Sequence, residues 1–328
     1  MHRAYVDASR TNWAGDGLRP LATTVWYPAS AESVESAWTA GVFEFGSGAE
    51  DASFADVQAH PLIVMSHGTG GSAAQLSWLA EELVAAGFVV AAVNHHGNTA
   101  VEDKAWPQGF VLPGERARDL AVLIDQLLAD PELSAHIDST RIGAAGFSLG
   151  GYTVLVNAGA QLTFVERQQK CKIQLNNPVC HLPPEAGFSD ADIQALAESD
   201  PVFQKSMKQE GQPAADARIR AVYAIAPAFL SLMDSQNLSS VHIPLRVTLA
   251  EADQQILLAQ TLEAIHTGLP KASVSRIPDA GHYVFLARCS LRGRIFLADL
   301  CKDASEVDRI AVHKQVGTDA ANFFKANL

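Results

Sequence analysis

The chain has 328 residues, of which 48% are hydrophobic and 18% charged, enough to bury a large core in one α/β domain. Its formal net charge of −12 disfavours a surface for polyanions, so we expect no nucleic-acid partner. No segment reaches the roughly 18 uninterrupted apolar residues of a membrane span. Residues 1–20 are polar and lack the apolar segment of a signal peptide, which predicts a cytoplasmic protein. A processed form would instead be periplasmic or secreted.

Strand-like and helix-like segments alternate along most of the chain. β-branched and aromatic residues predict a first strand over 21–27, and a polar connection follows to about residue 60. Beyond it we expect, in order, strand 61–65, a helix over 72–87, strand 88–93, helix 114–130, strand 141–147, helix 149–160, strands 219–226 and 243–250, helix 254–267, strand 273–277 and helix 307–326. This alternation predicts parallel βαβ units in a doubly wound, mostly parallel sheet.

Residues 161–218 interrupt this alternation. They include two cysteines, a Pro-rich run at 181–184 and a predicted short helix near 190–199. An excursion of this length is more typical of a cap or lid than of a plain loop. We therefore expect a single domain over 1–328, in which 161–218 is a cap-like insertion able to fold over a site.

The sequence G-x-S-x-G occurs at 146–150, between a predicted strand and a predicted helix. A serine at such a turn is held in a strained backbone conformation that lifts its hydroxyl above the sheet. Gly146 and Gly150 lack the Cβ atoms that would otherwise collide. The pattern predicts that Ser148 is a nucleophile.

A nucleophilic serine needs a base, and the base needs an acid that orients it. His282 follows the strand predicted at 273–277, at the sheet edge where Ser148 should emerge, and is the best base among eleven histidines. Glu251 and Asp253 both follow the strand predicted at 243–250, which gives the chain order serine, acid, histidine. We favour Asp253, because it lies further into the loop and is freer to turn, and keep Glu251 as the alternative. We interpret Asp279 as a turn residue.

Two backbone amides should stabilise the negative charge that develops on a substrate oxygen. Leu149, directly after the nucleophile, is expected to supply one. The glycine-rich run 66–71 should supply the other, and Thr69 is the predicted donor. We interpret His67, in the same run, as structural.

Neither a metal nor a cofactor is expected. His95 and His96 are adjacent, and adjacent side chains rarely chelate one ion, so we favour a pocket-rim or packing role. No G-x-G-x-x-G opens a helix at the first strand-to-helix turn.

The four cysteines fall into two close pairs, Cys171 with Cys180 and Cys289 with Cys301. They indicate either two short-range disulfides in an exported protein or four reduced thiols in a cytosolic one.

Taken together, these motifs resemble the α/β-hydrolase superfamily from about residue 20 to the end. Within it, the chain resembles a bacterial group of predicted dienelactone hydrolases related to platelet-activating-factor acetylhydrolases. The resemblance is carried by Val25-Trp26-Tyr27-Pro28 and by the segments 66–71, 146–153, 250–253 and 280–286. It implies an α/β-hydrolase fold and favours the two disulfides. True dienelactone hydrolases have a cysteine where this chain has Ser148, so their substrate is not transferred to it.

We therefore expect a serine hydrolase of carboxylic esters, acting on small-molecule esters with short or medium acyl groups. The same triad could serve an amidase or a peptidase. A non-catalytic ligand-binding module of this fold is the alternative from a different class. The sequence indicates no oligomeric state.

Overall fold

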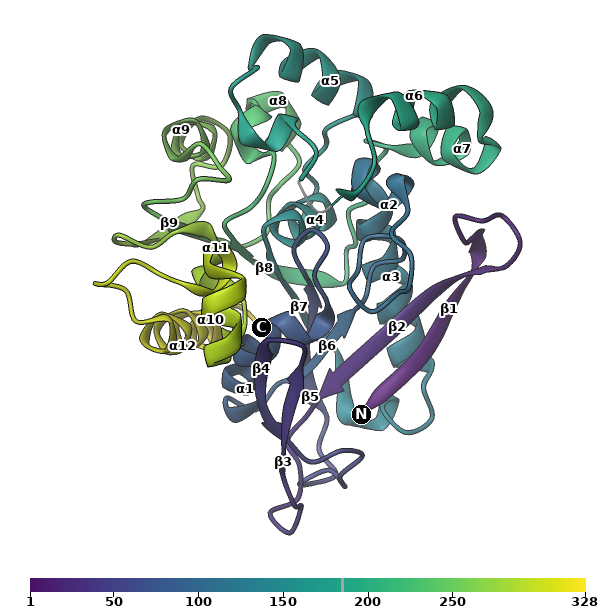
Figure 1. Ribbon diagram of the computed structural model, residues 1–328. Helices are drawn as coiled ribbons and strands as arrows, with labels where there is room; N and C mark the ends of the chain where they lie inside the picture. The colour runs from purple at the N-terminus through teal and green to yellow at the C-terminus, as the bar shows by residue number, and fades with distance from the viewer. Residues whose placement is uncertain (184–185) are drawn as a thin grey trace.

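The computed structural model describes residues 1–183 and 186–328, so positions 184 and 185 of the predicted insertion and its Pro-rich run lie outside the described residues. The main sheet has eight strands in the order β1-β2-β6-β5-β7-β8-β9-β10 (Figure 1). These strands are β1 (His2–Thr11), β2 (Leu18–Trp26), β5 (His60–Ser66), β6 (Val89–Val93), β7 (Ile137–Phe147), β8 (Ile219–Ile225), β9 (Leu245–Ala250) and β10 (Ser273–Ile277). β1 and β6 each pair with β2 in antiparallel fashion, and the pairs from β6 to β10 are parallel.

The helices follow the strands as expected for a doubly wound sheet. They are α1 (Ser77–Ala85), α2 (Pro107–Val111), α3 (Gly114–Ala129), α4 (Leu149–Asn157), α5 (Phe164–Ile173), α6 (Asp190–Ser199), α7 (Pro201–Gln209), α8 (Ser235–Leu238), α9 (Leu258–Gly268), α10 (Leu291–Phe296), α11 (Ala298–Cys301) and α12 (Arg309–Asn327). None of these described helices is long and apolar enough to span a lipid bilayer.

The order of the strands creates a reversal beside β5. The chain runs outward from β5 to β6 through α1, then returns past β5 to β7 through α3. Because such crossovers are right-handed, α1 and α3 lie on opposite faces of the sheet. α1 packs with α12, and α3 packs with α4. The loops after β5 and β7 therefore lie side by side at the carboxyl edge, where α/β proteins place their ligands.

The N-terminal part of the chain contains more strand than the sequence predicted. The expected polar connection before residue 60 holds β3 (Ser36–Ala40) and β4 (Phe43–Gly48), which form a second sheet with the two-residue strand β11 (Arg288–Cys289). Trp38, Phe43 and Phe45 anchor this sheet against Ala74 and Ala287. These strands were missed because they are short and carry polar residues on an exposed face. β1 is longer, with ten residues, and was missed because most of them are exposed or only partly buried.

Residues 161–218 leave the main sheet after α4 and return to it at β8. The short helix predicted near 190–199 is α6, whereas α5 and α7 were not predicted. Figure 1 draws α5, α6 and α7 together at the top of the molecule, with α2 below them. The segment has its own hydrophobic cluster, which it shares with α2 and the N-terminal loop; the cluster is formed by Trp13, Phe110, Val111, Leu112, Phe164, Ala186, Ile193 and Phe203.

The four cysteines form two disulfides in the structure. Cys171 in α5 is joined to Cys180, and Cys289 is joined to Cys301 in α11.

Candidate active site

Ser148 lies in a sharp turn between β7 and α4, with a φ of 56°. This is the left-handed region, which side-chain-bearing residues adopt only under strain. An added Cβ on Gly146 would lie 2.2 Å from the Gly150 oxygen, and one on Gly150 would lie 1.9 Å from the oxygen of Ser66. Gly146 is therefore required by the turn itself, whereas Gly150 is required because β5 passes directly beside it.

The structure brings Ser148, His282 and Asp253 into one chain of hydrogen bonds. His282 Nε2 lies 2.9 Å from Ser148 Oγ, and His282 Nδ1 lies 2.7 Å from Asp253 Oδ2. Because a carboxylate only accepts, Nδ1 carries the proton and Nε2 is left to accept from the serine hydroxyl. Ser148 is partly exposed, whereas His282 is buried.

Asp253 is held by its own loop as well as by the histidine. Its Oδ1 accepts the main-chain N–H groups of Gln255 at 2.7 Å and Ile256 at 3.0 Å. Its side chain has no exposed surface, although the residue as a whole is only partly buried. The carboxylate is thus fixed in place before it meets His282.

The alternative acids lie elsewhere. Glu251 forms an ion pair with Arg276, at 2.8 Å, on a partly exposed part of the surface. Asp279 has a φ of 57°, as a residue in a tight turn does.

The loop after β5 lies beside the nucleophile. An added Cβ on Gly68 would be 3.5 Å from the Ser148 Cβ. The Gly68 oxygen accepts from the Gly71 N–H at 3.2 Å and lies 2.7 Å from His67 Nδ1. Since the C=O and N–H bonds of a trans peptide point in opposite directions, the following N–H, that of Thr69, is directed away from the His67 ring. The Leu149 amide opens α4, where the first N–H groups have no partner within the helix.

A buried polar network supports this loop from below, and the sequence did not predict it. His95 Nε2 lies 2.8 Å from Ser66 Oγ, and His95 Nδ1 lies 2.9 Å from Asp119 Oδ2. Asp119, in α3, also accepts from Arg19 at 2.7 Å and from Arg10 at 2.6 Å.

Although burial opposes ionisation, Arg19 and Arg10 hold the pKa of Asp119 well below its usual range. Burial and the nearby Arg116 lower the pKa of His95 to about 3, so this ring is neutral.

A signal for Asp119 was present in the sequence. It precedes Leu123 by four positions in a predicted helix, and this spacing places it on the same face as the buried leucines. The two adjacent histidines, for which a pocket-rim or packing role was expected, are both buried and have different hydrogen-bond partners. His96 accepts from the Trp13 N–H at 3.0 Å and lies 2.8 Å from Glu102.

Comparison with known proteins agrees with this fold. Residues 63–289 match the alpha/beta hydrolase family. A stretch of 91 residues is 33% identical to cutinase est1 of Thermobifida alba and 31% identical to cutinase cut1 of Thermobifida fusca. It covers 27% of this chain and 27% and 25% of those proteins, so the match spans about a quarter of these curated relatives.

Two solved structures share the architecture over nearly the whole chain. A ferulic acid esterase from Streptomyces cinnamoneus has a TM-score of 0.59 at 21% identity, covering 100% of this chain and 88% of that one. Esterase 2 of Thermogutta terrifontis has a TM-score of 0.50 at 13% identity, covering 98% and 94%. The prediction of an α/β-hydrolase fold is confirmed, and the chain belongs to the alpha/beta hydrolase family.

Proposed function

We propose that this protein is a serine hydrolase of carboxylic esters. The observation that carries the proposal is the continuous hydrogen-bond chain from Ser148 through His282 to Asp253, which starts at a strained turn. Similarity to proteins named cutinases supports an ester as the substrate class.

In the proposed reaction, Ser148 Oγ attacks the ester carbonyl carbon while His282 Nε2 takes the hydroxyl proton. The resulting oxyanion is held by the N–H groups of Leu149 and Thr69. Its collapse expels the alcohol, which takes the proton from His282 and leaves an acyl group on the serine. Water, deprotonated by His282, then attacks the acyl carbonyl. When this second intermediate collapses, the acid is released and Ser148 Oγ takes the proton back from His282. Asp253 keeps His282 in the required tautomer and stabilises its protonated form.

We propose that the substrate carries a short or medium acyl group and that residues 161–218 cover its binding site. Contacts between this segment and the region of the nucleophile support the cap. The guanidinium of Arg167, in α5, lies 4.9 Å from the Phe229 ring centre, and that ring lies 5.2 Å from Tyr152, one helical turn after Ser148. The motifs quoted above also support placement of the chain in the dienelactone hydrolase-like group with a serine nucleophile.

The proposal is tested with p-nitrophenyl acetate, butyrate and octanoate. Ser148→Ala should lower kcat by roughly 10⁴-fold or more. Ser77→Ala removes another buried serine, in α1, and should leave turnover unchanged. A fluorophosphonate probe should modify Ser148, as located by peptide mass spectrometry.

Retained turnover in Ser148→Ala would reject the assignment. Absence of labelling together with absence of turnover would favour a non-catalytic binding module. Cleavage of anilides without cleavage of esters would favour an amidase.

A further inference from the structure

The segment between Cys289 and Cys301 presents apolar side chains to solvent. Leu291, Ile295, Phe296 and Leu297 lie within seven positions and are between 42% and 75% exposed. We call these four residues the apolar patch. Clusters of exposed apolar side chains mark sites where a protein contacts another protein, a ligand or a membrane.

The patch faces outward because α10 packs against the rest of the protein through Gly293. An added Cβ on Gly293 would lie 3.0 Å from Val42, 3.1 Å from the Cys289 Cβ and 3.2 Å from the Cys301 sulfur. The side of α10 that meets the protein therefore has no room for a side chain. Ser290 Oγ caps the helix by accepting the Gly293 N–H at 3.3 Å.

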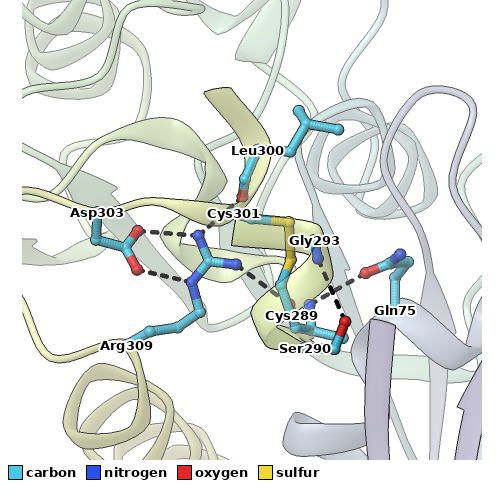
Figure 2. Close-up of a disulfide and its surroundings, with 9 residues drawn as sticks. Gln75, Cys289, Ser290, Gly293, Leu300, Cys301, Asp303 and Arg309 are labelled. Atoms are coloured by element: carbon cyan, nitrogen blue, oxygen red, sulfur yellow. Dashed lines mark hydrogen bonds and ion pairs between the residues drawn. A yellow bond between two sulfur atoms is a disulfide. The ribbon is translucent and has the colours of Figure 1, made fainter. Parts of the chain in front are cut away.

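Arg309 holds the ends of this segment in place, as Figure 2 shows. It donates to the main-chain oxygens of Ala287, at 3.2 Å, and Leu300, at 2.9 Å. Its remaining contacts are a two-point ion pair with Asp303, at 2.8 and 3.0 Å. With the disulfide, these contacts give the patch a fixed platform.

The surroundings of the patch are basic, although the protein is acidic. Residues 288–302 contain four basic residues and one acidic residue, whereas the whole chain has 24 basic and 36 acidic residues. The basic side chains are all exposed and are Arg288, Arg292, Arg294 and Lys302. Within residues 1–183 and 186–328, the last three have no ion-pair partner, and Arg288 is 3.6 Å from Glu44.

A surface hollow of about 400 Å³ adjoins the patch and is lined by Arg288, Arg294 and Lys302. Two acidic residues also line it, and both are engaged within the chain. Asp303 pairs with Arg309, and Asp308 caps α12 by accepting the N–H groups of Ile310 and Ala311. The hollow therefore offers cations to a phosphate group at the border of the apolar patch.

We propose that the apolar patch and its basic border are a docking surface for an anionic lipid bilayer. Apolar side chains of such a surface enter the boundary between headgroups and acyl chains, while arginine and lysine attract acidic headgroups. A second copy of this chain, bound through the same surface about a twofold axis, would bring its four basic residues into one interface with those of the first copy, and like charges repel. α11 contacts the 3₁₀ turn His282–Phe285, so docking would bring the bilayer close to the proposed catalytic histidine.

The test uses Ser148→Ala protein, which cannot hydrolyse vesicle lipids if the proposed function holds, so binding is measured separately from catalysis. Co-sedimentation with phosphatidylglycerol vesicles should show binding that is at least about tenfold tighter than binding to phosphatidylcholine vesicles and that weakens with salt. In this background, adding Ile295→Ser with Phe296→Ser, or Arg292→Gln with Arg294→Gln, should weaken binding about tenfold or more.

Matched controls change exposed residues elsewhere. Val34→Ser with Val57→Ser, and Lys172→Gln with Lys325→Gln, should bind as the parent does. All variants should keep the parent's unfolding temperature. No binding to phosphatidylglycerol, equal binding to both vesicles, or binding that all variants retain would overturn the proposal. Light scattering that detects a dimer abolished by Ile295→Ser with Phe296→Ser would also overturn it, in favour of a second copy.

Discussion

The main-chain amide of His95 donates a hydrogen bond to Nε2 of His67 across 3.1 Å. This bond places the ring proton of His67 on Nδ1, the atom that donates to the Gly68 oxygen. Burial and the adjacent Arg116 hold the pKa of His67 well below its usual range, so the ring stays neutral. A neutral imidazole in one tautomer thus sets the orientation of the peptide that leads into Thr69.

His67 should therefore act as a positioning residue for the proposed oxyanion donor. We expect His67→Leu to lower kcat by roughly tenfold or more, with little change in KM, because an oxyanion contact acts in the transition state. His67→Asn should keep most of kcat, since its amide nitrogen can occupy the place of Nδ1.

Steady-state kinetics and thermal unfolding of both variants test this role. Equal losses of kcat in the two variants, or losses that only follow stability, would contradict it.

The identity of the acid can be tested with two neighbouring carboxylates. Asp253→Asn should lower kcat/KM by about 10⁴-fold, because the amide can donate to Nδ1 and so favours the wrong tautomer of His282. Glu251→Gln removes only a partly exposed ion pair with Arg276 and should stay within a few-fold of wild type. The measurement is kcat/KM for p-nitrophenyl acetate, and the reverse order of effects would assign the acid to Glu251.

Asp119 should be a major source of stability. Asp119→Asn weakens the buried contacts to Arg10 and Arg19 and should lower the free energy of unfolding by about 3–5 kcal/mol. Asp125→Asn breaks an exposed ion pair with Arg218 and should cost less than about 1 kcal/mol. Urea unfolding of both variants checks this, and similar values for the two would argue against a structural role for the network.

Glu210 should make stability fall as the pH rises. Burial raises the pKa of this glutamate to about 7, from 4.5 in the unfolded chain, although Arg167 and the Gly114 N–H oppose the shift. The folded state therefore keeps a proton that the unfolded state releases. This contribution is fully present below about pH 4.5 and is lost as the pH rises through 7, for a total of about 3 kcal/mol.

Glu210→Gln keeps the position neutral and should remove this dependence. Its unfolding free energy should match wild type near pH 4.5 and exceed it at pH 8. Glu263→Gln, at an exposed position in α9, should follow wild type at both values. A wild-type stability that rises with pH over this interval, by an amount that Glu210→Gln abolishes, would show the opposite linkage.

Local patterns in the sequence were sufficient to predict much of the fold. The buried strands β5 to β9 contain short apolar runs, because parallel strands covered on both faces need apolar side chains. Strand β10 was predicted with the bounds that the structure has. Strands β1, β3 and β4 were not recognisable, since a half-exposed strand is stabilised by its neighbours rather than by its own composition.

In the candidate site, too, some residues could be predicted from the sequence and others could not. The sequence alone identified Ser148 and His282 as candidates, because each occupies a position that a sheet of known direction sends to one edge. It favoured Asp253 as the acid and kept Glu251 as the alternative, since only the folded loop decides which carboxylate turns toward the histidine. It gave no reason to connect His67 and His95 with Asp119, because these residues meet through contacts between separate elements. Spacing along the chain determines which edge of the sheet a residue reaches. Hydrogen-bond partners depend on packing between distant segments, so only the tertiary structure decided them.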